Sequence, residues 1–464
     1  MKAAASSAPT LVETVTVAIA DRIASRQLAP GARLPSVRAF AEAMGVSKST
    51  VVEAYDRLGA EGAIVARRGS GFYVAGKTRP LCLKVIGPEL DRAVDPLWIT
   101  RQSMQAGPGL LMPGSGWLPA TWLPEDAIRR NLRQLARTAH AELTSYDQPL
   151  GFAPLRSQIA RRLDEKGVAA DADQIILVDS ATQAVDLLGR FLLSPGDTVV
   201  VDDPCYFNFH ALLRSHHVRI VGVPYTPTGP DLVQFEAILA AHRPRFYLTN
   251  SALHNPTGAT LAPMVAHRVL RLAETHDTLI IEDDIFGDLE PEAAPRLAGF
   301  DGLQRVIQVG SFSKTLSAAV RCGFIAARGD WVEPLVDLKL AMSLGSGHLA
   351  AVLMHRLITD GSYRHHLADV RDKLARDMGQ AARHLEACGL KPWIEPRGGM
   401  FLWARLPGGL DSADVARRAL AKGVVLAPGV VFSTSPLGQE FLRFNVAHCG
   451  DPRIFSVLAS AMSG

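Results

Sequence analysis

Cysteine and long apolar runs are both scarce in this chain of 464 residues. The five cysteines are odd in number, scattered along the chain, and form no Cys-x-x-Cys pair. This usage indicates reduced thiols and argues against a structural zinc site, so we expect no metal. No run approaches the roughly 18 to 20 apolar residues that span a bilayer. The N-terminal residues also lack the apolar core of a signal peptide, so we expect a cytoplasmic protein with no membrane contact.

Net charge is also small, at +3, but it is unevenly distributed. Residues 1–80 contain eleven basic and six acidic side chains, which leaves the remainder slightly acidic. A local basic end is typical of a surface that binds phosphates. The hydrophobic content of 48% predicts sizeable cores, and the length exceeds that of one ordinary domain.

The first eighty residues carry the signals of three short helices. Thr10 and Glu13 have the spacing of a capping box before an apolar repeat that begins at Leu11. Ser36 and Ser47 can cap two further helices, separated by a turn at Gly45. Two helices joined by a tight turn containing glycine are typical of a helix-turn-helix. A three-helix interaction module with a solvated basic loop is the alternative.

Two apolar segments, 63–66 and 72–74, flank a basic, glycine-rich tip and predict a wing. Together with Leu34-Pro-Ser-x-Arg38 and Gly45-Val-Ser-Lys-Ser-Thr-Val51, this region resembles the GntR-type winged helix. The resemblance implies contacts with an operator in duplex DNA. The residues implied are Ser36, Arg38, Ser47, Lys48, Ser49, Thr50, Arg68 and Gly69. Val52 departs from the pattern, because many relatives have an arginine there.

We expect a winged-helix domain at residues 1–78, a linker at 79–105 and a large domain at 106–464. In the large domain, short apolar runs beginning at Ile175, Thr198, Phe246, Leu279 and Val306 alternate with segments of helical length. That alternation predicts an α/β domain on a mostly parallel sheet, with a smaller C-terminal subdomain. Ligands of such sheets bind beyond the carboxyl ends of the strands. Gly107–Gly109 and Gly114–Gly116 follow no strand, so we predict no dinucleotide fingerprint.

Residues just past these strands fit the requirements of pyridoxal phosphate. The cofactor needs a lysine, a carboxylate for its ring nitrogen, an anion cradle for its phosphate and an aromatic ring to stack on it. Each of these motifs alone is weak, because such segments are more often plain turns. The candidates, in chain order, are Thr182, Gln183, Tyr206, Asn255, Asp283, Ser311, Ser313, Lys314, Arg321 and Arg443.

The order and spacing of these residues resemble fold type I aminotransferases over nearly all of residues 106–464. The whole chain resembles the MocR group, in which a GntR head precedes an aminotransferase-like domain. The resemblance implies that Lys314 forms the internal aldimine and that Asp283, as the second catalytic residue, pairs with the ring nitrogen. Asn255 would bind the phenolic oxygen, and Tyr206 would stack on the ring.

The same resemblance implies that Thr182, Gln183, Ser311, Ser313 and Arg321 hold the phosphate. Tyr146 would reach the phosphate of the partner subunit in a homodimer, and Arg443 would bind the carboxylate of an effector.

Two positions bear on catalysis. Relatives usually have tyrosine two residues after the ring-nitrogen aspartate, where this chain has Ile285. The missing phenol predicts weak or no transaminase activity, unless Phe286 or another group compensates. Asn255, by contrast, stands in a segment like that of true aminotransferases.

Three functions therefore stay open. The first is a transcription regulator that senses an amino compound as an external aldimine. The second is an active aminotransferase with a DNA-binding head, and the third is a sensor of pyridoxal phosphate itself.

Overall fold

The computed structural model describes residues 10–24, 28, 31–67, 70–75, 100, 104, 109–137 and 144–463. The chain divides into two compact units, Met1–Cys82 and Leu83–Gly464. Among the described residues, no helix combines the length and the apolar character that crossing a membrane requires.

The first unit folds around the side chain of Tyr55, which is fully buried. Its hydroxyl donates to the Pro35 carbonyl oxygen at 2.9 Å, and its ring packs edge-on against Phe72. Three helices and an antiparallel pair of strands surround it: α1 (Leu11–Ala24), α2 (Val37–Met44), α3 (Lys48–Ala60), β1 (Ile64–Arg67) and β2 (Gly71–Val74). The predicted helix-turn-helix with a two-stranded wing is confirmed.

The predicted helix caps are also present. Thr10 N donates to Glu13 Oε2 at 2.8 Å, and Glu13 N donates to Thr10 Oγ1 at 3.2 Å, which completes the capping box. The Ser36 and Ser47 hydroxyls each accept from the backbone amide three residues later. Gly45 ends α2 with φ +64°, a conformation that favours glycine.

The second unit is built on an eight-stranded sheet in the order β3-β10-β9-β8-β7-β4-β5-β6. The strands are β3 (Ile175–Val178), β4 (Thr198–Asp203), β5 (Arg219–Thr226), β6 (Gly229–Pro230), β7 (Phe246–Thr249), β8 (Leu279–Asp283), β9 (Val306–Ser311) and β10 (Gly323–Ala326). The neighbouring strands β9, β8, β7, β4 and β5 are parallel, which agrees with the predicted mostly parallel sheet, whereas β10 and β6 are antiparallel to their neighbours. Three strands of this sheet were not predicted: β5, β6 and β10, of which β10 inserts between β3 and β9.

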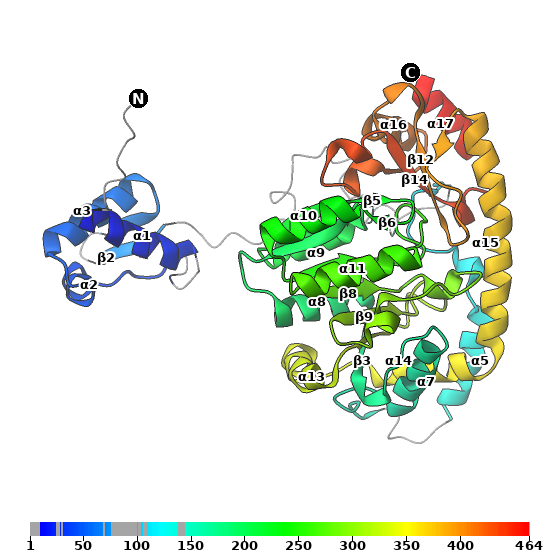
Figure 1. Cartoon of the computed structure of the whole chain (residues 1–464), viewed down its shortest axis with the longest axis horizontal. Helices are drawn as coiled ribbons and strands as arrows, with labels where there is room; N and C mark the ends of the chain where they lie inside the picture. The colour runs from blue at the N-terminus through cyan, green and yellow to red at the C-terminus, as the bar shows by residue number, and fades with distance from the viewer. Residues whose placement is uncertain are drawn as a thin grey trace. The chain divides into compact units, whose positions relative to one another are not determined.

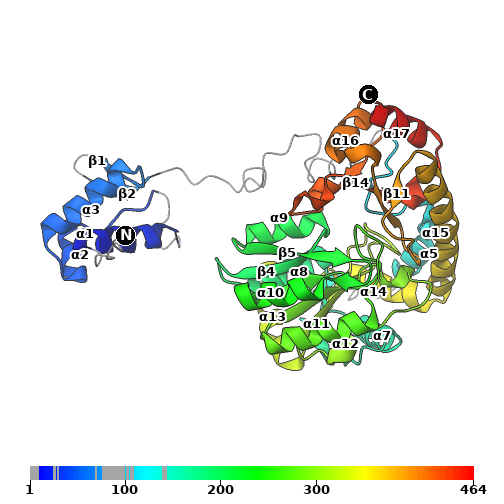
Figure 2. The same cartoon turned by 45° about the horizontal axis from the view of Figure 1, so that its top comes forward.

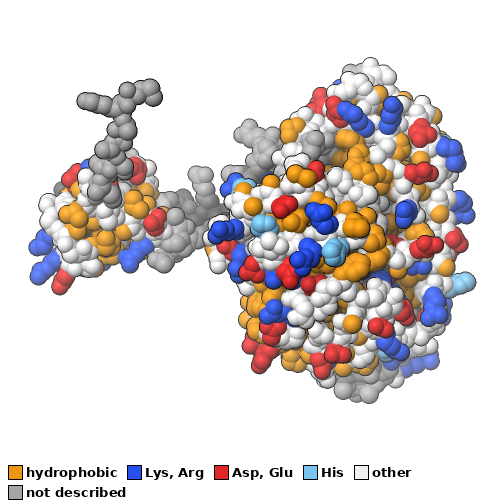
Figure 3. All heavy atoms as spheres, viewed as in Figure 1, with side chains coloured by type: hydrophobic (Ala, Val, Ile, Leu, Met, Phe, Trp, Pro, Cys, Tyr) orange, Lys and Arg blue, Asp and Glu red, His pale blue; other side chains and the backbone are white. Residues whose placement is uncertain are grey.

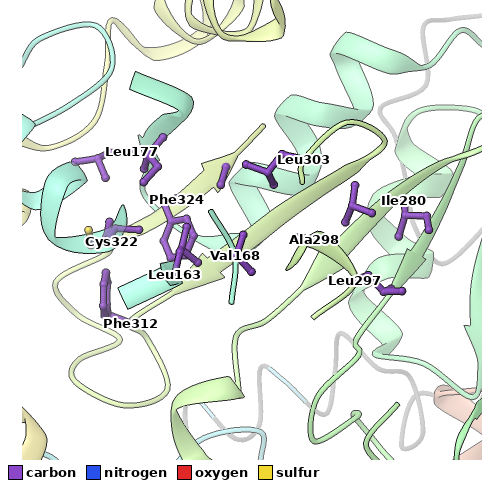
Figure 4. Packing of buried hydrophobic residues seen from close by; sticks show 14 of the residues in the cluster. Leu163, Val168, Leu177, Ile280, Leu297, Ala298, Leu303, Phe312, Cys322 and Phe324 are labelled. Carbon is purple, nitrogen blue, oxygen red and sulfur yellow. The ribbon is translucent and has the colours of Figure 1, made fainter. Parts of the chain in front are cut away.

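Helices cover both faces of this sheet (Figures 1 and 2). One face packs on α7 (Ala153–Asp164), α10 (Leu232–His242), α11 (Pro263–Thr275), α12 (Leu297–Asp301) and α14 (His348–Thr359). The other packs on α8 (Ala181–Leu192), α9 (Phe207–Ser215) and α13 (Gly329–Ser343). Side chains alternate between the two cores, so Leu177 and Ile280 join the first cluster (Figure 4) while Ile176 and Ile281 join the second.

A smaller subdomain follows the long helix α15 (Ser362–Ala387), which runs along one side of the unit (Figure 1). It contains a four-stranded antiparallel sheet in the order β11-β12-β14-β13. Its strands and helices are β11 (Lys391–Pro392), β12 (Phe401–Arg405), β13 (Ala427–Pro428), β14 (Phe441–Asn445), α16 (Ser412–Leu420) and α17 (Arg453–Ser463). The third hydrophobic core lies between this sheet and its helices.

Candidate cofactor and effector site

The candidate residues of the second unit follow strands whose ends lie at one edge of the sheet. Asp283 is the last residue of β8, and Ser311 is the last residue of β9. In the sheet register Asp283 pairs with Val309, two residues before Ser311. Asn255 follows β7, and Tyr206 follows β4 after a short turn. The parallel order of these strands therefore gathers residues that are far apart in the sequence.

Lys314 lies just beyond β9 and its ammonium group donates to the Gly116 carbonyl oxygen at 2.7 Å. Burial and the positive charges of Arg443 and Arg321 lower its pKa to about 8, although Asp283 opposes this effect. A lysine with a depressed pKa supplies the neutral amine that a Schiff base requires. Lys314 is therefore suited to hold an aldehyde cofactor.

Asp283 is buried, and its carboxyl has few partners. Burial raises its pKa to about 7. The backbone amide of Ile285, which donates to Oδ1 at 3.2 Å, acts in the opposite direction and lowers this pKa. Among the described residues, that amide is the one hydrogen-bond donor to this carboxylate. A protonated ring nitrogen would supply both the missing donor and a compensating positive charge. The residue therefore fits a pyridinium group.

Arg443, on β14, is 1% exposed and links three parts of the unit. Its Nη1 donates to Asn255 Oδ1 at 2.9 Å, and its Nη2 donates to the Gly114 carbonyl oxygen at 2.7 Å. Its guanidinium also lies 4.4 Å from the ring centroid of Phe401 and 4.8 Å from that of Phe432. Burial lowers its pKa to about 9, and its Nε is buried without a hydrogen-bond partner among the described residues.

The contact with Arg443 fixes the orientation of the Asn255 amide. Because Oδ1 accepts from Arg443, the Nδ2 group is left to donate elsewhere, as binding of a phenolic oxygen requires. The Asn255 backbone amide donates to Asn250 Oδ1 at 2.9 Å, and Asn250 Nδ2 donates to the Asp283 carbonyl oxygen. Asn250 thus ties Asn255 to the end of β8, a role that the sequence analysis missed.

The candidate phosphate cradle forms around β10. Gly323 pairs with Val178 on one side and with Ser311 on the other. A Cβ at Gly323 would lie 2.8 Å from the Gly310 carbonyl oxygen and 3.0 Å from the Ser180 carbonyl carbon, so only glycine lets these strand ends approach so closely. This approach brings the first turn of α8 beside Ser311. A helix N-terminus next to hydroxyl donors is suited to an anion.

The other predicted phosphate ligands lie around this cradle. Thr182 is exposed on the first turn of α8, and Gln183 Oε1 accepts from the Asp179 amide at 2.6 Å. Ser313 Oγ lies 2.9 Å from Ser311 Oγ, which also donates to the Cys322 carbonyl oxygen. Arg321, two residues before β10, is exposed and has φ +52°.

Two tyrosines occupy contrasting surroundings. Burial raises the pKa of Tyr206, and this pKa also responds to the charges of Arg443 and Asp283, so the phenol lies within the site. Tyr146, by contrast, is 83% exposed, and no described residue of the same chain covers it.

Neither Ile285, where the resemblance predicts a missing tyrosine, nor the residue after it carries a hydroxyl. Ile285 is half-buried between two hydrophobic clusters. Phe286 is buried and packs edge-on against Phe401, with ring centroids 5.4 Å apart. Its ring carries no polar group, so it cannot compensate for the missing phenol.

The segment that contains Gly114 and Gly116 also contributes to the site, through contacts that the sequence pattern did not predict. Gly114 and Gly116 supply the carbonyl oxygens that bind Arg443 and Lys314. A Cβ at Gly114 would lie 2.6 Å from the Ala427 backbone nitrogen, so this approach requires glycine. Phe401 and Phe432 were also missed, because their contact with Arg443 depends on tertiary packing alone.

In the first unit, the predicted DNA-contacting side chains lie at the starts of α2 and α3. Ser36 and Arg38 on α2 are exposed, as are Ser47, Lys48 and Ser49 at the start of α3; Thr50 is half-buried. The Ser47 hydroxyl lies 2.7 Å from the hydroxyls of both Ser49 and Thr50. Arg68 and Gly69 lie outside the described residues. Val52, where many relatives have arginine, is 43% exposed.

Both units match known protein families. Residues 11–74 match the gntR family of bacterial regulatory proteins, and residues 118–459 match the family described as aminotransferase class I and II. The uncharacterized HTH-type transcriptional regulator YdcR of Escherichia coli is 31% identical over 447 residues, covering 92% of this chain and 93% of YdcR. The chain belongs to the MocR-type members of the aminotransferase class I and II family.

Enzymes of the aminotransferase class I and II family resemble the second unit of this MocR-type chain. The 2-aminoadipate transaminase of Thermus thermophilus is 31% identical over 350 residues, covering 73% of this chain and 86% of the enzyme. The crystal structure of LysN, an alpha-aminoadipate aminotransferase from the same species, has a TM-score of 0.72 and 27% identity. It covers 79% of this chain and 94% of its own, and was solved with N-(5'-phosphopyridoxyl)-L-leucine.

The first prediction concerns Asp283. We expect Asp283→Asn to gain stability relative to the unsubstituted, cofactor-free MocR-type chain as pH rises from 5 to 8. The aspartate titrates at about 7 when folded and at about 4 when unfolded, so the folded state holds the extra proton between these values. The unsubstituted chain therefore loses stability as pH rises through this window, whereas asparagine has no proton to lose.

Urea unfolding followed by tryptophan fluorescence provides the measurement, because all six tryptophans lie beyond residue 82 and report on the second unit. A stability difference between the two proteins that is the same at pH 5 and at pH 8 would contradict the prediction.

Proposed function

We propose that this chain is a ligand-responsive transcription regulator. That it is a transcription regulator with an aminotransferase-like domain follows from its family, whose cofactor is pyridoxal phosphate. We infer further that an amino compound exchanges for Lys314 on the cofactor as an external aldimine, and that this exchange changes how the heads bind an operator. The observation that carries the proposal is the buried Arg443, whose positive charge lowers the pKa of Lys314.

Each residue of the site would have a separate role in binding the cofactor or the effector. Lys314 holds the cofactor and is released as a free amine when another amine takes its place. Asp283 keeps the ring nitrogen protonated, and the Asn255 amide donates to the phenolic oxygen. Tyr206 stacks on the ring. Thr182, Gln183, Ser311, Ser313 and Arg321 bind the phosphate. Arg443 binds the carboxylate of the effector, which replaces backbone and amide oxygens as its acceptor.

An active aminotransferase is the second candidate. The Asn255–Arg443 contact and the likeness to the Thermus thermophilus transaminase favour it. Ile285 argues against it, because a phenolic hydrogen bond is worth about 0.5 to 1.5 kcal/mol and neither Ile285 nor Phe286 can supply one. A sensor of pyridoxal phosphate alone is the third reading.

The central experiment titrates the cofactor-loaded chain with a panel of amino acids and amines, and follows both cofactor absorbance and DNA mobility. We expect one or more carboxylated amines to change both signals. Arg443→Gln should weaken their binding about tenfold or more, because a charge-assisted hydrogen bond is worth roughly 1.5 to 3 kcal/mol. Amines without a carboxylate should bind both proteins equally.

Lys339 provides the control for the anchoring lysine. It is 2% exposed, burial lowers its pKa to about 8, and it donates to the Pro149 carbonyl oxygen. Borohydride should trap the cofactor on Lys314 and not on Lys339, and Lys314→Ala should prevent trapping. Steady conversion of a 2-oxo acid would favour the aminotransferase, and a DNA response to the cofactor alone would favour the third reading.

The DNA-binding head generates the next prediction. Arg38→Ala and Lys48→Ala should each weaken binding of the full chain to a fluorescent duplex of mixed sequence. Each should also lower the slope of log affinity against log salt by about one unit, because one phosphate contact is lost. Arg57→Ala is the matched control, since Arg57 lies at the other end of α3 and pairs with Glu53 at 2.7 Å. Equal loss in all three variants would refute specific contacts at Arg38 and Lys48.

The acidic and basic side chains of the second unit are interspersed on the face drawn in Figure 3. That face therefore has no broad basic field that would compete with the head for DNA.

We further propose a homodimer with shared cofactor sites, because a ring as exposed as Tyr146 is suited to reach a neighbouring subunit. Mixing Tyr146→Ala and Lys314→Ala chains under conditions of exchange should restore part of the cofactor signal. In a mixed dimer one site would carry both substitutions and the other would be intact. Absence of recovery, or a monomer in sedimentation, would exclude a shared site.

A further inference from the structure

A second cavity of the large unit lies away from Lys314. Its volume is about 670 Å³, within the range of small-molecule sites. It opens between the end of α7, the short helix η4 (Gly287–Leu289) and the junction of α14 with α15. These elements meet at the end of the unit remote from α16 and α17 (Figure 1). Lys314 and Arg443 are not among its lining residues.

The walls of this cavity carry an excess of positive charge. Five cationic side chains line it: Arg161, Arg162, Lys166, Arg364 and Arg371. Three acidic side chains line it as well: Glu165, Asp288 and Glu290. Whether the cavity can bind an anion therefore depends on which of these charged side chains already form ion pairs.

Two of the three carboxylates are already paired. Asp288 lies 2.8 Å from Arg162 and 3.1 Å from Lys166, and these cations hold its pKa well below the usual range although burial opposes them. Glu290 pairs with Arg296, a fully buried arginine. These contacts fix the floor of the cavity and neutralise two of its three negative charges, leaving that of Glu165.

Three arginines remain with donors to spare. Within the described part of the chain, Arg161 bonds only the neutral Gln158, and Arg364 forms no ion pair. Arg371 donates from Nε and Nη2 to the Asp288 carbonyl oxygen, at 3.0 and 2.8 Å, which leaves Nη1. Arg161 and Arg364 are exposed, and guanidinium groups that line one cavity can form bidentate bonds with phosphates and carboxylates.

Hydrogen bonds connect the floor of the cavity to the side chain of Thr315, the residue that follows Lys314. The Tyr363 hydroxyl donates to Asp288 Oδ2 at 2.7 Å. It also lies 2.8 Å from the hydroxyl of Thr315, the residue after Lys314. A change in charge at Asp288 therefore reaches the backbone that carries Lys314 through one tyrosine.

A small void provides a second connection. It measures about 30 Å³, room for a water molecule. The void is lined on one side by Arg162, Lys166 and Asp288, which also line the large cavity. Ile285 and Ser311 of the proposed cofactor site line it as well, but they do not line the large cavity. The position that lacks the tyrosine of relatives thus adjoins the floor of the large cavity.

We infer that this cavity is a second ligand site, for a small polyanion such as a phosphorylated metabolite or a tricarboxylate, and that its occupancy is sensed at Lys314. The sensing depends on the proposed cofactor function, whereas the binding does not. Such a ligand would join Arg161, Arg364 and Arg371 across the mouth of the cavity. It would also alter the field on Asp288 and hence the hydrogen bonds of Tyr363.

The binding test uses the full chain saturated with pyridoxal phosphate, so that the cofactor's own phosphate site is filled. Pyrophosphate and citrate are titrated by calorimetry. The double variant Arg161→Gln/Arg364→Gln should bind about tenfold more weakly or worse, since charge-assisted bonds are lost. The control Arg268→Gln/Arg376→Gln removes the same charge from exposed positions outside the cavity and should bind as the unsubstituted chain does.

The two probes distinguish the source of the anion. Binding of pyrophosphate alone indicates a phosphorylated ligand, and binding of citrate alone indicates a carboxylate ligand. Arg443→Gln identifies any citrate bound at the effector site, because citrate in the proposed cavity is insensitive to that change. Affinity that is absent, or that the two double variants reduce equally, would overturn the site.

The sensing test follows the pH titration of cofactor absorbance with and without the bound probe. The probe should shift the titration in the unsubstituted chain. Tyr363→Phe should keep the binding and lose the shift, because the link to Thr315 is gone. Binding without any shift in the unsubstituted chain would refute the sensing, while the response to amino compounds, measured separately, tests the proposed function itself.

Discussion

The buried positive charge of Arg443 is the constraint on which the site depends. Removing such a charge from water costs several kcal/mol unless hydrogen bonds and nearby aromatic faces compensate. The chain meets this requirement with Asn255, the Gly114 carbonyl oxygen and the rings of Phe401 and Phe432. None of these oxygens carries a full negative charge, and Nε has no partner among the described residues. The guanidinium is therefore held in place but incompletely neutralised, which suits it to a ligand carboxylate.

This arrangement makes three distant segments depend on one another. Gly114 precedes the main sheet, Asn255 follows β7, and Arg443 lies in the second sheet. The segment of Gly114 also supplies the carbonyl oxygen that holds Lys314. A carboxylate that replaces either acceptor of Arg443 must therefore change the contacts of the other segments. If an effector at Arg443 changes DNA affinity, as we propose, DNA must change effector affinity by the same factor.

The sequence predicted those parts of the fold that depend on local pattern. Alternation, caps and turn chemistry located the three helices of the head, five strands of the large sheet and the residues at their ends. It did not predict β5, β6 or β10. The position of β10, an antiparallel strand between β3 and β9, is set by tertiary pairing around Gly323. The contacts of Gly114, Asn250 and Phe432 were missed for the same reason. A backbone carbonyl or a ring gives no chemical signal in the sequence until packing brings it to a charge.

Ile285 illustrates how the aminotransferase fold could serve a sensor instead of a transaminase. A transaminase must tune the phenolic oxygen of its cofactor through repeated proton transfers, and a tyrosine beside that oxygen contributes to each cycle. A sensor needs only an equilibrium between Lys314 and an effector amine, so it tolerates the loss. Where the phenol would be, the chain has a half-buried aliphatic side chain beside a void that reaches Asp288 and Lys166. Those two residues also pair with each other and line the large basic cavity. Ile285 therefore lies beside a void whose opposite side is formed by residues of the second cavity, so charges in that cavity lie within electrostatic reach of the proposed cofactor site.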